Sequence, residues 1–466
     1  MDKVFDSAEA ALADVPDGAS VSIAGFGITH RFPATLITAL RDKGVRGLTV
    51  YCNGLGQPGQ PTAMMLAENK QIARLVAAFS SRPGPPTVAE AQIAAGEVEM
   101  ELVPQGTLVE RMRAGGAGIP AFFTPAGAAT AIAEGKEVRY FGGQAHILEQ
   151  GIQTDYALLR GYRADRMGNV VFRGGSRNFN DSFAKAARVA IIEVEEIVET
   201  GELPPEQVHL PGIFISRVVA TTVHVDPADM PRAPRRAAVS GRSYAGKPAL
   251  TRAEIGRRVA ALFQAGQVVN LGAGLPTQAA NFVQGQGVLL HAENGILNYG
   301  PFVTDGSPDP DLHDAAGNFI ALNPGASFFD SVTSFEIARS GRLDAVVLGA
   351  YQVDELGDLA NYARPGMAGG GIGGAMDLAV GARQVIAMLE HQDSQGRPKL
   401  VARCDYPVTT PRCVDVIVTD LALLRRERDG FRLEEIAAGF TVDEVLALTD
   451  MAVRVPEHVG VLQESW

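Results

Sequence analysis

The stretch DYALLRGYRADRMGNV, residues 155–170, decides the fold because its pattern recurs as DAVVLGAYQVDELGDL at residues 344–359. At one constant offset the two stretches share Asp, Leu, Tyr, Asp and Gly. Each begins with an apolar run of strand length and ends in a polar turn at a glycine. The coincidences predict that the chain contains two halves of similar topology.

Other segments extend the repeat in both directions. Residues 187–188 (AR) match residues 382–383, and the second half gains its extra residues in the glycine-rich segment 364–376. Near the start of each half, an apolar run enters a glycine turn, VSIAGFG at 21–27 and VVNLGAG at 268–274. Helix-like segments follow at 33–40 and 277–283. Such strand–turn–helix openings are typical of α/β domains. We therefore expect two similar open α/β domains, a pseudo-duplication, with a ligand site between them.

The stretch 226–251 separates these halves. It is rich in Pro, Ala and Arg and has no apolar periodicity, which indicates a linker. The chain of 466 residues is also too long for one ordinary core. We expect an N-terminal domain at 1–225, a linker at 226–251 and a C-terminal domain at 252–466.

Composition restricts the possible partners and compartment. A net charge of −12 argues against a nucleic-acid surface. No window approaches 18 uninterrupted apolar residues, and the start lacks a basic region followed by an apolar one. Cys52, Cys404 and Cys413 are odd in number and widely spaced, as in proteins of reducing compartments. We expect a cytoplasmic protein with neither nucleic acid nor membrane as a partner.

Glu293 is the first candidate for chemistry. It follows the apolar run 288–290 and precedes Asn294-Gly295, so it is predicted to lie where a buried strand ends in a turn. Ligands of open α/β sheets bind at that edge. A carboxylate there can act as a nucleophile. The alternative is a turn glutamate bonded to its own loop.

Several familiar motifs are incomplete. His291-Ala292-Glu293 matches the H-x-E of zinc deaminases, but the P-C-x-x-C that should follow is missing. The glycine turns at 25–27 and 272–274 lack the third glycine of a dinucleotide fingerprint, and no phosphate loop or HExxH cluster occurs. We expect no metal and no nicotinamide cofactor, and we expect His291 to pack or hydrogen-bond at the strand end.

Two further segments could supply hydrogen-bond donors. The run GGGIGG at 369–374 lets backbone N–H groups approach a ligand closely, unless it is only a flexible loop. In the first half, Thr107 is a plausible helix N-cap with Glu110 three residues later. Gln105 would then stand just before the helix, either directing its amide into a cleft or solvated.

In this order the segments resemble the class I CoA-transferases, most closely the 3-oxoacid CoA-transferase branch with its α and β subunits fused. The resemblance spans nearly the whole chain. It is carried by GEVEMELVPQGTLVERMRAGGAGIPAFFTP at 96–125, ADRMGN at 164–169, RNFN at 177–180, EVEE at 193–196, NLGAGLP at 270–276, ENG at 293–295, PGASFF at 324–329, GDLAN at 357–361 and GGAMDL at 373–378.

The resemblance implies roles for individual residues. Glu293 would attack an acyl-CoA to give an acyl-glutamyl anhydride and then a glutamyl-CoA thioester. The side chain of Gln105 and the backbone N–H of Gly374 would form the oxyanion hole. No cofactor would be tightly bound, CoA thioesters and small carboxylic acids would be the ligands, and a homodimer would be expected. Substrate contacts would come from Gly25, Gly27, Asn53, Asn270, Gly272, Gly274, Asn294 and Gly373.

Two first-half loops depart from the family pattern. The family's GGFG-x-x-G-x-P appears here as AGFGITHRFP at 24–33, so that His30-Arg31 replace a glycine. Residues 79–86 read FSSRPGPP where a Tyr-Val-Gly-Glu-Asn type of run is usual. As a hypothesis, Arg31 or Arg82 pairs with the distal carboxylate of a dicarboxylic substrate.

These observations predict a CoA-transferase that moves CoA from an acyl-CoA such as succinyl-CoA to a 3-oxo or short-chain acid. Two alternatives stay open at this point. One is an acyl-CoA hydrolase on the same scaffold, with water as acceptor. The other is a catalytically silent sensor that binds CoA esters, although binding alone does not need a nucleophile.

Overall fold

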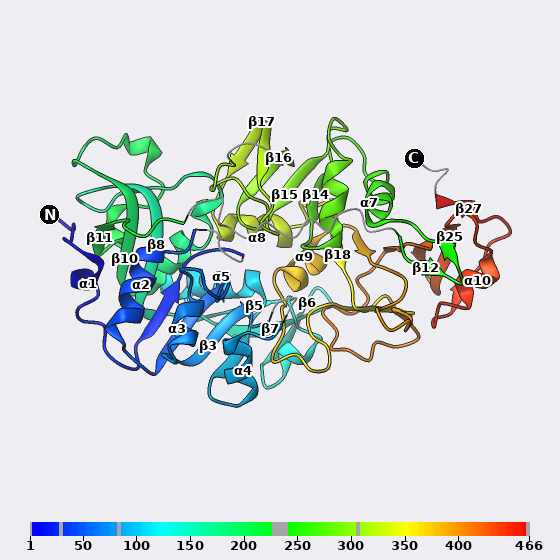
Figure 1. Ribbon diagram of the computed structural model, residues 1–466, viewed down its shortest axis with the longest axis horizontal. Coiled ribbons are helices and arrows are strands. Elements are labelled where there is room, and N and C mark those ends of the chain that lie inside the picture. The colour runs from blue at the N-terminus through cyan, green and yellow to red at the C-terminus, as the bar shows by residue number, and fades with distance from the viewer. Residues whose placement is uncertain (1, 28–30, 82–84, 226–240, 304–307, 463–466) are drawn as a thin grey trace.

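In the computed structural model the two halves lie side by side along the longest axis of the molecule (Figure 1). The structure describes residues 2–27, 31–81, 85–225, 241–303 and 308–462. Each half is built around one large sheet. The fold class is therefore α/β, as the alternation of apolar runs and helix-like segments predicts.

The first sheet is parallel along its whole path, in the order β11-β10-β8-β1-β2-β3-β4. The short β9 pairs antiparallel with β8. Its strands are β1 (Ser20–Ile23), β2 (Leu48–Gly54), β3 (Ile72–Phe79), β4 (Glu99–Leu102), β8 (Thr154–Asp165), β9 (Val170–Val171), β10 (Ala187–Val198) and β11 (Arg217–Ala220). Its helices are α1 (Ala8–Ala11), α2 (Ala34–Lys43), α3 (Met64–Glu68), α4 (Val88–Ala94), α5 (Gln105–Gly116) and α6 (Asn180–Ala186).

The second sheet has parallel strands at its centre, in the order β15-β14-β18-β21-β23, and antiparallel strands outside them. Its strands are β14 (Val268–Leu271), β15 (Leu289–Ala292), β16 (Ile296–Phe302), β17 (Ile320–Phe328), β18 (Ala345–Gly349), β21 (Val385–Met388), β23 (Val416–Val418), β24 (Ala422–Glu427), β25 (Gly430–Ile436), β26 (Val453–Arg454) and β27 (Gly460–Val461). Its helices are α7 (Arg252–Ala260), α8 (Ser331–Arg339), α9 (Ala375–Gly381) and α10 (Val442–Leu446).

The central strands explain the internal repeat. The order β10-β8-β1-β2 of the first sheet corresponds to β21-β18-β14-β15 of the second. Asp155 accepts a hydrogen bond from the backbone N–H of Ser20, at the start of β1, and Asp344 does the same for Val268, at the start of β14. The repeated carboxylates therefore hold equivalent pairs of strands in register.

The repeated turns are also equivalent. Asp165 accepts hydrogen bonds from the backbone N–H groups two and four residues later, and Asp354 does likewise. The glycine at the third position after each carboxylate, Gly168 or Gly357, has a positive φ. The shared Asp and Gly thus encode one tight-turn geometry.

The halves differ beyond the shared strands. In the first half, α3 crosses from β2 to a parallel β3. In the second half, β15 turns back directly into the antiparallel β16. The helix expected at 33–40 is confirmed as α2, whereas the one expected at 277–283 is a 3₁₀ segment, η5 (Leu275–Asn281). Pro276 at its second position, with no N–H to donate, is consistent with that tighter form.

Three small sheets complete the architecture. They are β5 (Ala121–Thr124) with β6 (Val138–Phe141) and β7 (Gln144–Gln150), β19 (Gln352–Asp354) with β20 (Leu359–Ala360) and β22 (Leu400–Val401), and the hairpin of β12 (Ser243–Tyr244) and β13 (Lys247–Pro248).

That hairpin belongs to the predicted linker 226–251, of which residues 226–240 lie outside the described residues. Its Tyr244 hydroxyl donates to Asp420, and the Leu250 N–H donates to the Asp420 carbonyl. This end of the predicted linker is therefore packed against the second half.

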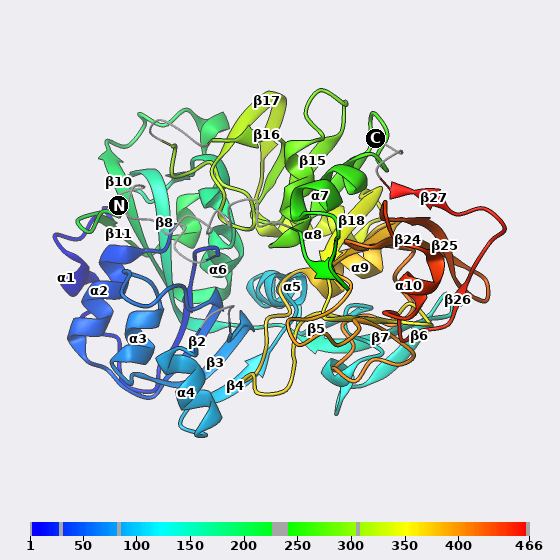
Figure 2. The same cartoon turned by 45° about the vertical axis from the view of Figure 1, so that its right-hand side comes forward.

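The two halves meet where α5 packs against α8 and α9 (Figure 2). The N–H of Gly106 donates to Asp377 on α9, and a Cβ atom at Gly106 would lie only 2.4 Å from Oδ1 of that carboxylate. Arg339 on α8 pairs with Asp377 and with Glu110 on α5. The largest hydrophobic core is continuous across this contact, so the halves share buried apolar area as well as polar contacts.

Candidate active site

Glu293 lies at the C-terminal end of β15, in the tight turn that leads to β16. Its neighbour Gly295 has φ 104°, and a Cβ atom there would lie 1.9 Å from the Phe329 carbonyl oxygen. Only glycine fits this close approach. The prediction that Glu293 stands at a strand edge before an Asn-Gly turn is confirmed.

The environment of Glu293 is dry. The residue is 7% exposed, and its Oε2 has no hydrogen-bond partner among the described residues. Burial raises the pKa of Glu293 to about 6, opposed by hydrogen bonding that includes Asn270. Above that pH the side chain is a carboxylate with little solvation, a state that strengthens its interaction with donors and electrophiles.

Asn270 and His291 form the floor beneath this carboxylate. Asn270, on β14, donates to the backbone carbonyl of His291 at 3.2 Å. His291 is fully buried between Asn270 and the hydroxyl of Ser334, and burial lowers its pKa to about 4. The imidazole is therefore neutral at physiological pH and supports the strand end, as expected.

Gly374 brings the glycine-rich segment against Glu293. A Cβ atom built on Gly374 would lie 3.1 Å from Oε1 of Glu293 and 3.3 Å from Oε1 of Gln105. Gly374 is the residue just before α9, and no described acceptor takes its backbone N–H. This N–H is available to a ligand beside the carboxylate.

Gln105 reaches the same point from the first half. It begins α5, is 1% exposed, and its backbone N–H donates to the Gly373 carbonyl at 2.9 Å. The side-chain amide donates one N–H to Asn53 at 2.9 Å, which leaves a second N–H. The expectation that Thr107 caps this helix is wrong, because the helix starts two residues earlier with Pro104 as its N-cap.

The glycine-rich segment is held by the end of β3. Phe79 forms an antiparallel bridge with Gly371, and the Ser80 N–H donates to the Gly370 carbonyl. The Ser80 hydroxyl accepts from the Gly370 N–H and donates to the Ala368 carbonyl. The segment is therefore an ordered bridge between the halves and not a free loop.

These elements enclose a cavity of about 350 Å³. Of the predicted site residues, its wall contains Gly27, Asn53, Gln105, Gly272, Glu293, Gly373 and Gly374. Asn270 and Asn294 lie behind the wall and are fully buried, whereas Gly25 and Gly274 shape the turns on either side of lining residues. Glu293, Gln105 and Gly374 thus come together as predicted, from both halves of the chain.

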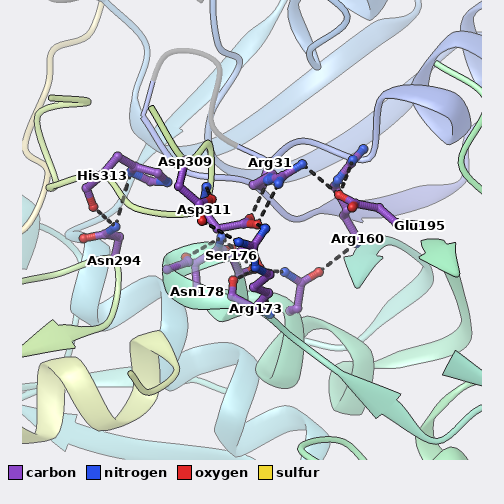
Figure 3. A network of polar contacts seen from close by, with 12 residues as sticks. Arg31, Arg160, Arg173, Ser176, Asn178, Glu195, Asn294, Asp309, Asp311 and His313 are labelled. Carbon is purple, nitrogen blue, oxygen red and sulfur yellow. Dashed lines mark hydrogen bonds and ion pairs between the residues drawn. The ribbon is translucent and has the colours of Figure 1, made fainter. Parts of the chain in front are cut away.

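Arg31 lies elsewhere. Its guanidinium makes two hydrogen bonds to Asp311, at 2.5 and 2.7 Å, and pairs with Glu195 at 3.0 Å (Figure 3). It is not part of the cavity wall. The structure therefore gives Arg31 two carboxylate partners from the chain itself. Arg82, the other predicted partner of a substrate carboxylate, lies outside the described residues.

Sequence reasoning missed the far end of the cavity. Its wall continues along the C-terminal ends of β14, β18 and β21 and includes Arg252, Glu390 and Lys399. Arg252 pairs with Glu390 at 2.8 Å, whereas no described residue makes an ion pair with Lys399. The match between residues 187–188 and 382–383 is the sequence signal that could have identified the end of β21 as a second site-forming edge.

The arrangement suits acyl transfer. A buried carboxylate can attack a carbonyl, while the Gly374 N–H and the Gln105 amide stand where an oxyanion would need donors. Across the described residues there is no group of three or more His, Cys, Asp or Glu able to hold a metal ion. Nor does that part of the chain contain a helix long and apolar enough to span a membrane.

Comparisons with known proteins agree with this geometry. The family model described as Coenzyme A transferase matches residues 5–221 and 252–448. Human mitochondrial succinyl-CoA:3-ketoacid coenzyme A transferase 2 is 40% identical over 97% of this chain and 90% of its own length. The rat mitochondrial enzyme 2A is 38% identical over 99% and 91%.

The first half also has relatives that are separate proteins. One of the two subunits of succinyl-CoA:3-ketoacid coenzyme A transferase from Xanthomonas campestris is 50% identical over 47% of this chain and 88% of its own length. Among solved structures, an acyl-CoA transferase of Escherichia coli O157:H7, in a thioester complex with CoA, shares the fold with a TM-score of 0.78. That alignment has 19% identity and covers 99% of this chain and 95% of the other. The family model and the near full-length relatives establish that the chain belongs to the coenzyme A transferase family.

Proposed function

We propose that this CoA-transferase moves CoA from succinyl-CoA to a 3-oxo acid, with Glu293 as the nucleophile. One observation carries the proposal. A buried carboxylate with an unpartnered oxygen faces an unclaimed backbone N–H at Gly374 and an amide at Gln105. The near full-length relatives bear the name succinyl-CoA:3-ketoacid coenzyme A transferase, which supports the choice of substrates.

The first half-reaction releases the donor acid. An oxygen of Glu293 attacks the thioester carbonyl, a C–O bond forms, and the C–S bond breaks to give an acyl-glutamyl anhydride and CoA thiolate. The thiolate then attacks the glutamyl carbonyl, so that a glutamyl-CoA thioester forms and the donor carboxylate leaves. The acceptor acid reverses both steps. No proton has to move, which is consistent with a neutral His291 beneath the nucleophile.

Each tetrahedral intermediate places a negative charge on the former carbonyl oxygen. The Gly374 N–H and the second N–H of Gln105 would stabilise that charge, each by roughly 3 kcal/mol. Asn53 holds the Gln105 amide by accepting its other N–H. Because the two donors come from different halves, the reaction requires the halves to be docked.

The extended shape of the cavity suits CoA. From β15 to β21 the sheet crosses three strand spacings, about 14 Å. With the thioester at Glu293, the pantetheine arm would run along this edge, and Arg252 and Lys399 would face the anionic phosphates. Binding energy from that remote end can be used at the reacting carbonyl.

The finer assignments complete the proposal. The division into domains 1–225 and 252–466 with a linker at 226–251 is supported by the two ranges that the family model matches. We propose that substrate CoA is the only CoA species required, with no tightly bound cofactor, and that the enzyme is a homodimer in the cytoplasm. The rat and human relatives carry mitochondrial names, so fractionation of the source cells is the test of compartment. Light scattering tests the dimer.

Intact-mass spectrometry tests the function. The protein is incubated with succinyl-CoA or acetoacetyl-CoA beside the Glu293→Gln variant. A covalent CoA adduct in the parent alone supports the proposal, and adding the acceptor acid should then discharge it with conservation of thioester. Release of free thiol without any acceptor would instead identify a hydrolase, and binding without an adduct would identify a CoA-ester sensor.

A further inference from the structure

A buried ion pair joins the two halves near the site. Arg31 belongs to the first-half loop 24–33, which departs from the family pattern, and Asp311 to a second-half loop. Their side chains are 10% and 3% exposed, and the two hydrogen bonds between them are bidentate. Arg173 adds a third contact to Asp311 at 3.2 Å from a more exposed position (Figure 3).

Asp311 continues directly into the support of Glu293. Two residues later, the His313 carbonyl accepts a hydrogen bond of 2.8 Å from the side chain of Asn294. Asn294 is the neighbour of Glu293 in the turn after β15 and is completely buried. A short chain of contacts therefore leads from Arg31 through Asp311 and His313 to the residue next to the nucleophile.

The first half touches Asn294 from a second side. The Gly175 N–H donates to the Asp311 carbonyl at 2.9 Å, and a Cβ atom at Gly175 would lie 2.8 Å from Nδ2 of Asn294. The loop carrying Asp311 is thus enclosed between Arg31 and the segment at 174–175. Asn294 has little freedom to move unless that loop moves first.

The energetics favour a fixed arrangement. A carboxylate this deeply buried is stable only while it is paired, and removing one partner of such a pair is far more costly than at a surface. Arg31 supplies two of the hydrogen bonds that Asp311 accepts. The ion pair therefore holds the 309–313 loop against the first half, whether or not substrate is present.

We propose that Arg31 is a positioning residue that fixes Glu293 through Asp311, His313 and Asn294. The inference rests on the proposed function, because it assigns Arg31 a part in how Glu293 attacks. It replaces the hypothesis that Arg31 binds the distal carboxylate of the substrate. The His30-Arg31 departure from the family then concerns the rate of the chemical step and not the choice of acid.

The test compares Arg31→Ala, Arg31→Lys, Asp311→Asn and the double variant Arg31→Ala/Asp311→Asn. The rate of CoA-adduct formation at saturating succinyl-CoA should fall roughly 10- to 100-fold in Arg31→Ala, the scale expected for a misplaced reacting group. KM for succinyl-CoA should change little. Because the two residues act as a pair, the double variant should lose no more than the worse single variant.

The control is Arg163→Ala, which removes another half-buried arginine, paired with Glu196 on the same sheet. It should leave the adduct rate unchanged. Arg31→Lys keeps the charge without the bidentate geometry and should recover part of the rate. This variant and the double variant also keep the test decisive if Arg31→Ala folds poorly.

Two outcomes would overturn the inference. An increase in KM for succinyl-CoA with an unchanged adduct rate would mark Arg31 as a substrate contact. Unchanged kinetics with a lowered melting temperature would mark a purely structural pair. Failure of the proposed function is separate and would show in the parent protein, which would form no adduct with either acyl-CoA.

Discussion

A Cβ atom built on Gly374 would lie 3.1 Å from Oε1 of Glu293, so the smallest residue of the glycine-rich segment sets the space beside the nucleophile. The same atom would lie 3.3 Å from Oε1 of Gln105. The three groups can meet only because position 374 carries no side chain.

Gly374→Ala should therefore lower the rate of CoA-adduct formation by roughly 10- to 100-fold, because the methyl group displaces Glu293 or Gln105 from the reacting geometry. Gly349→Ala is the matched control. It adds a methyl group to the same cavity wall, where the nearest atom would be 3.9 Å away. Equal losses in both variants would show that cavity volume matters, and not the contact at Glu293.

Glu293→Gln should abolish the adduct and stabilise the fold. Burial raises the pKa of Glu293 from 4.5 to about 6, so the folded protein binds this proton more tightly than the unfolded chain does. The charged side chain therefore costs about 2 kcal/mol of stability at pH 7. Chemical denaturation of both proteins at pH 7 should show this gain, and it should disappear near pH 4. An unchanged or lowered stability at pH 7 would contradict the assigned burial cost.

The chemical step should lose rate in mild acid. Above pH 6 Glu293 is mainly ionised, and below that pH each unit should reduce adduct formation about tenfold as the carboxylate is protonated. His291 contributes nothing in this range, because its pKa is lowered to about 4. The measurement is the single-turnover rate between pH 5 and 8. A midpoint above 7, or a flat profile, would assign the rate to another group.

Asp314 offers a second handle on that midpoint. Its charge raises the pKa of Glu293, although burial is the larger cause. Asp314→Asn should therefore move the midpoint of the pH–rate profile to lower pH. Asp393→Asn is the control, because Asp393 makes the same turn contacts with the N–H groups two and four residues later, in a more exposed turn. A shift of the same size in both variants would contradict a local electrostatic cause.

Gln105→Ala should lower kcat by about 10²- to 10³-fold with little change in KM, because it removes one oxyanion donor. Asn53→Ala should give a smaller loss, since it removes only the acceptor that orients the Gln105 amide. Steady-state kinetics with both substrates separate the two effects. A larger loss in Asn53→Ala than in Gln105→Ala would reverse the assigned order.

Lys399→Met should raise KM for succinyl-CoA roughly tenfold and leave the rate of a saturated enzyme nearly unchanged, since phosphate binding acts on ground and transition states alike. Lys247→Met, which removes a more exposed lysine paired with Glu444, is the control. A selective loss of kcat in Lys399→Met would place this side chain at the reacting atoms instead.

The sequence predicts the nucleophile well because its signals are local. An apolar run that stops at Asn-Gly locates the end of β15 without reference to any other segment. The helix start at Gln105 is less local. Its first N–H is taken by the Gly373 carbonyl of the other half, and this tertiary contact lets the helix begin before the expected Thr107 cap.

Arg31 and Lys399 show where such reasoning ends. The partner of Arg31 is 280 residues away in the chain, and no spacing rule joins a loop in one half to a loop in the other. Lys399 and Arg252 enter the cavity wall only because β21 lies two strands from β14. Strand order in a mixed sheet depends on how crossovers pack, which composition and periodicity do not encode.

The bridge between Phe79 and Gly371 has a consequence for how the enzyme is made. The first half leaves the ribosome before the glycine-rich segment does, so the strand end that will order this segment is synthesised first. Until the halves dock, Glu293 is present without its donors from α5 and the ordered glycines. A nascent or severed second half should therefore spare cellular acyl-CoA, because reactivity arises only when both halves have come together.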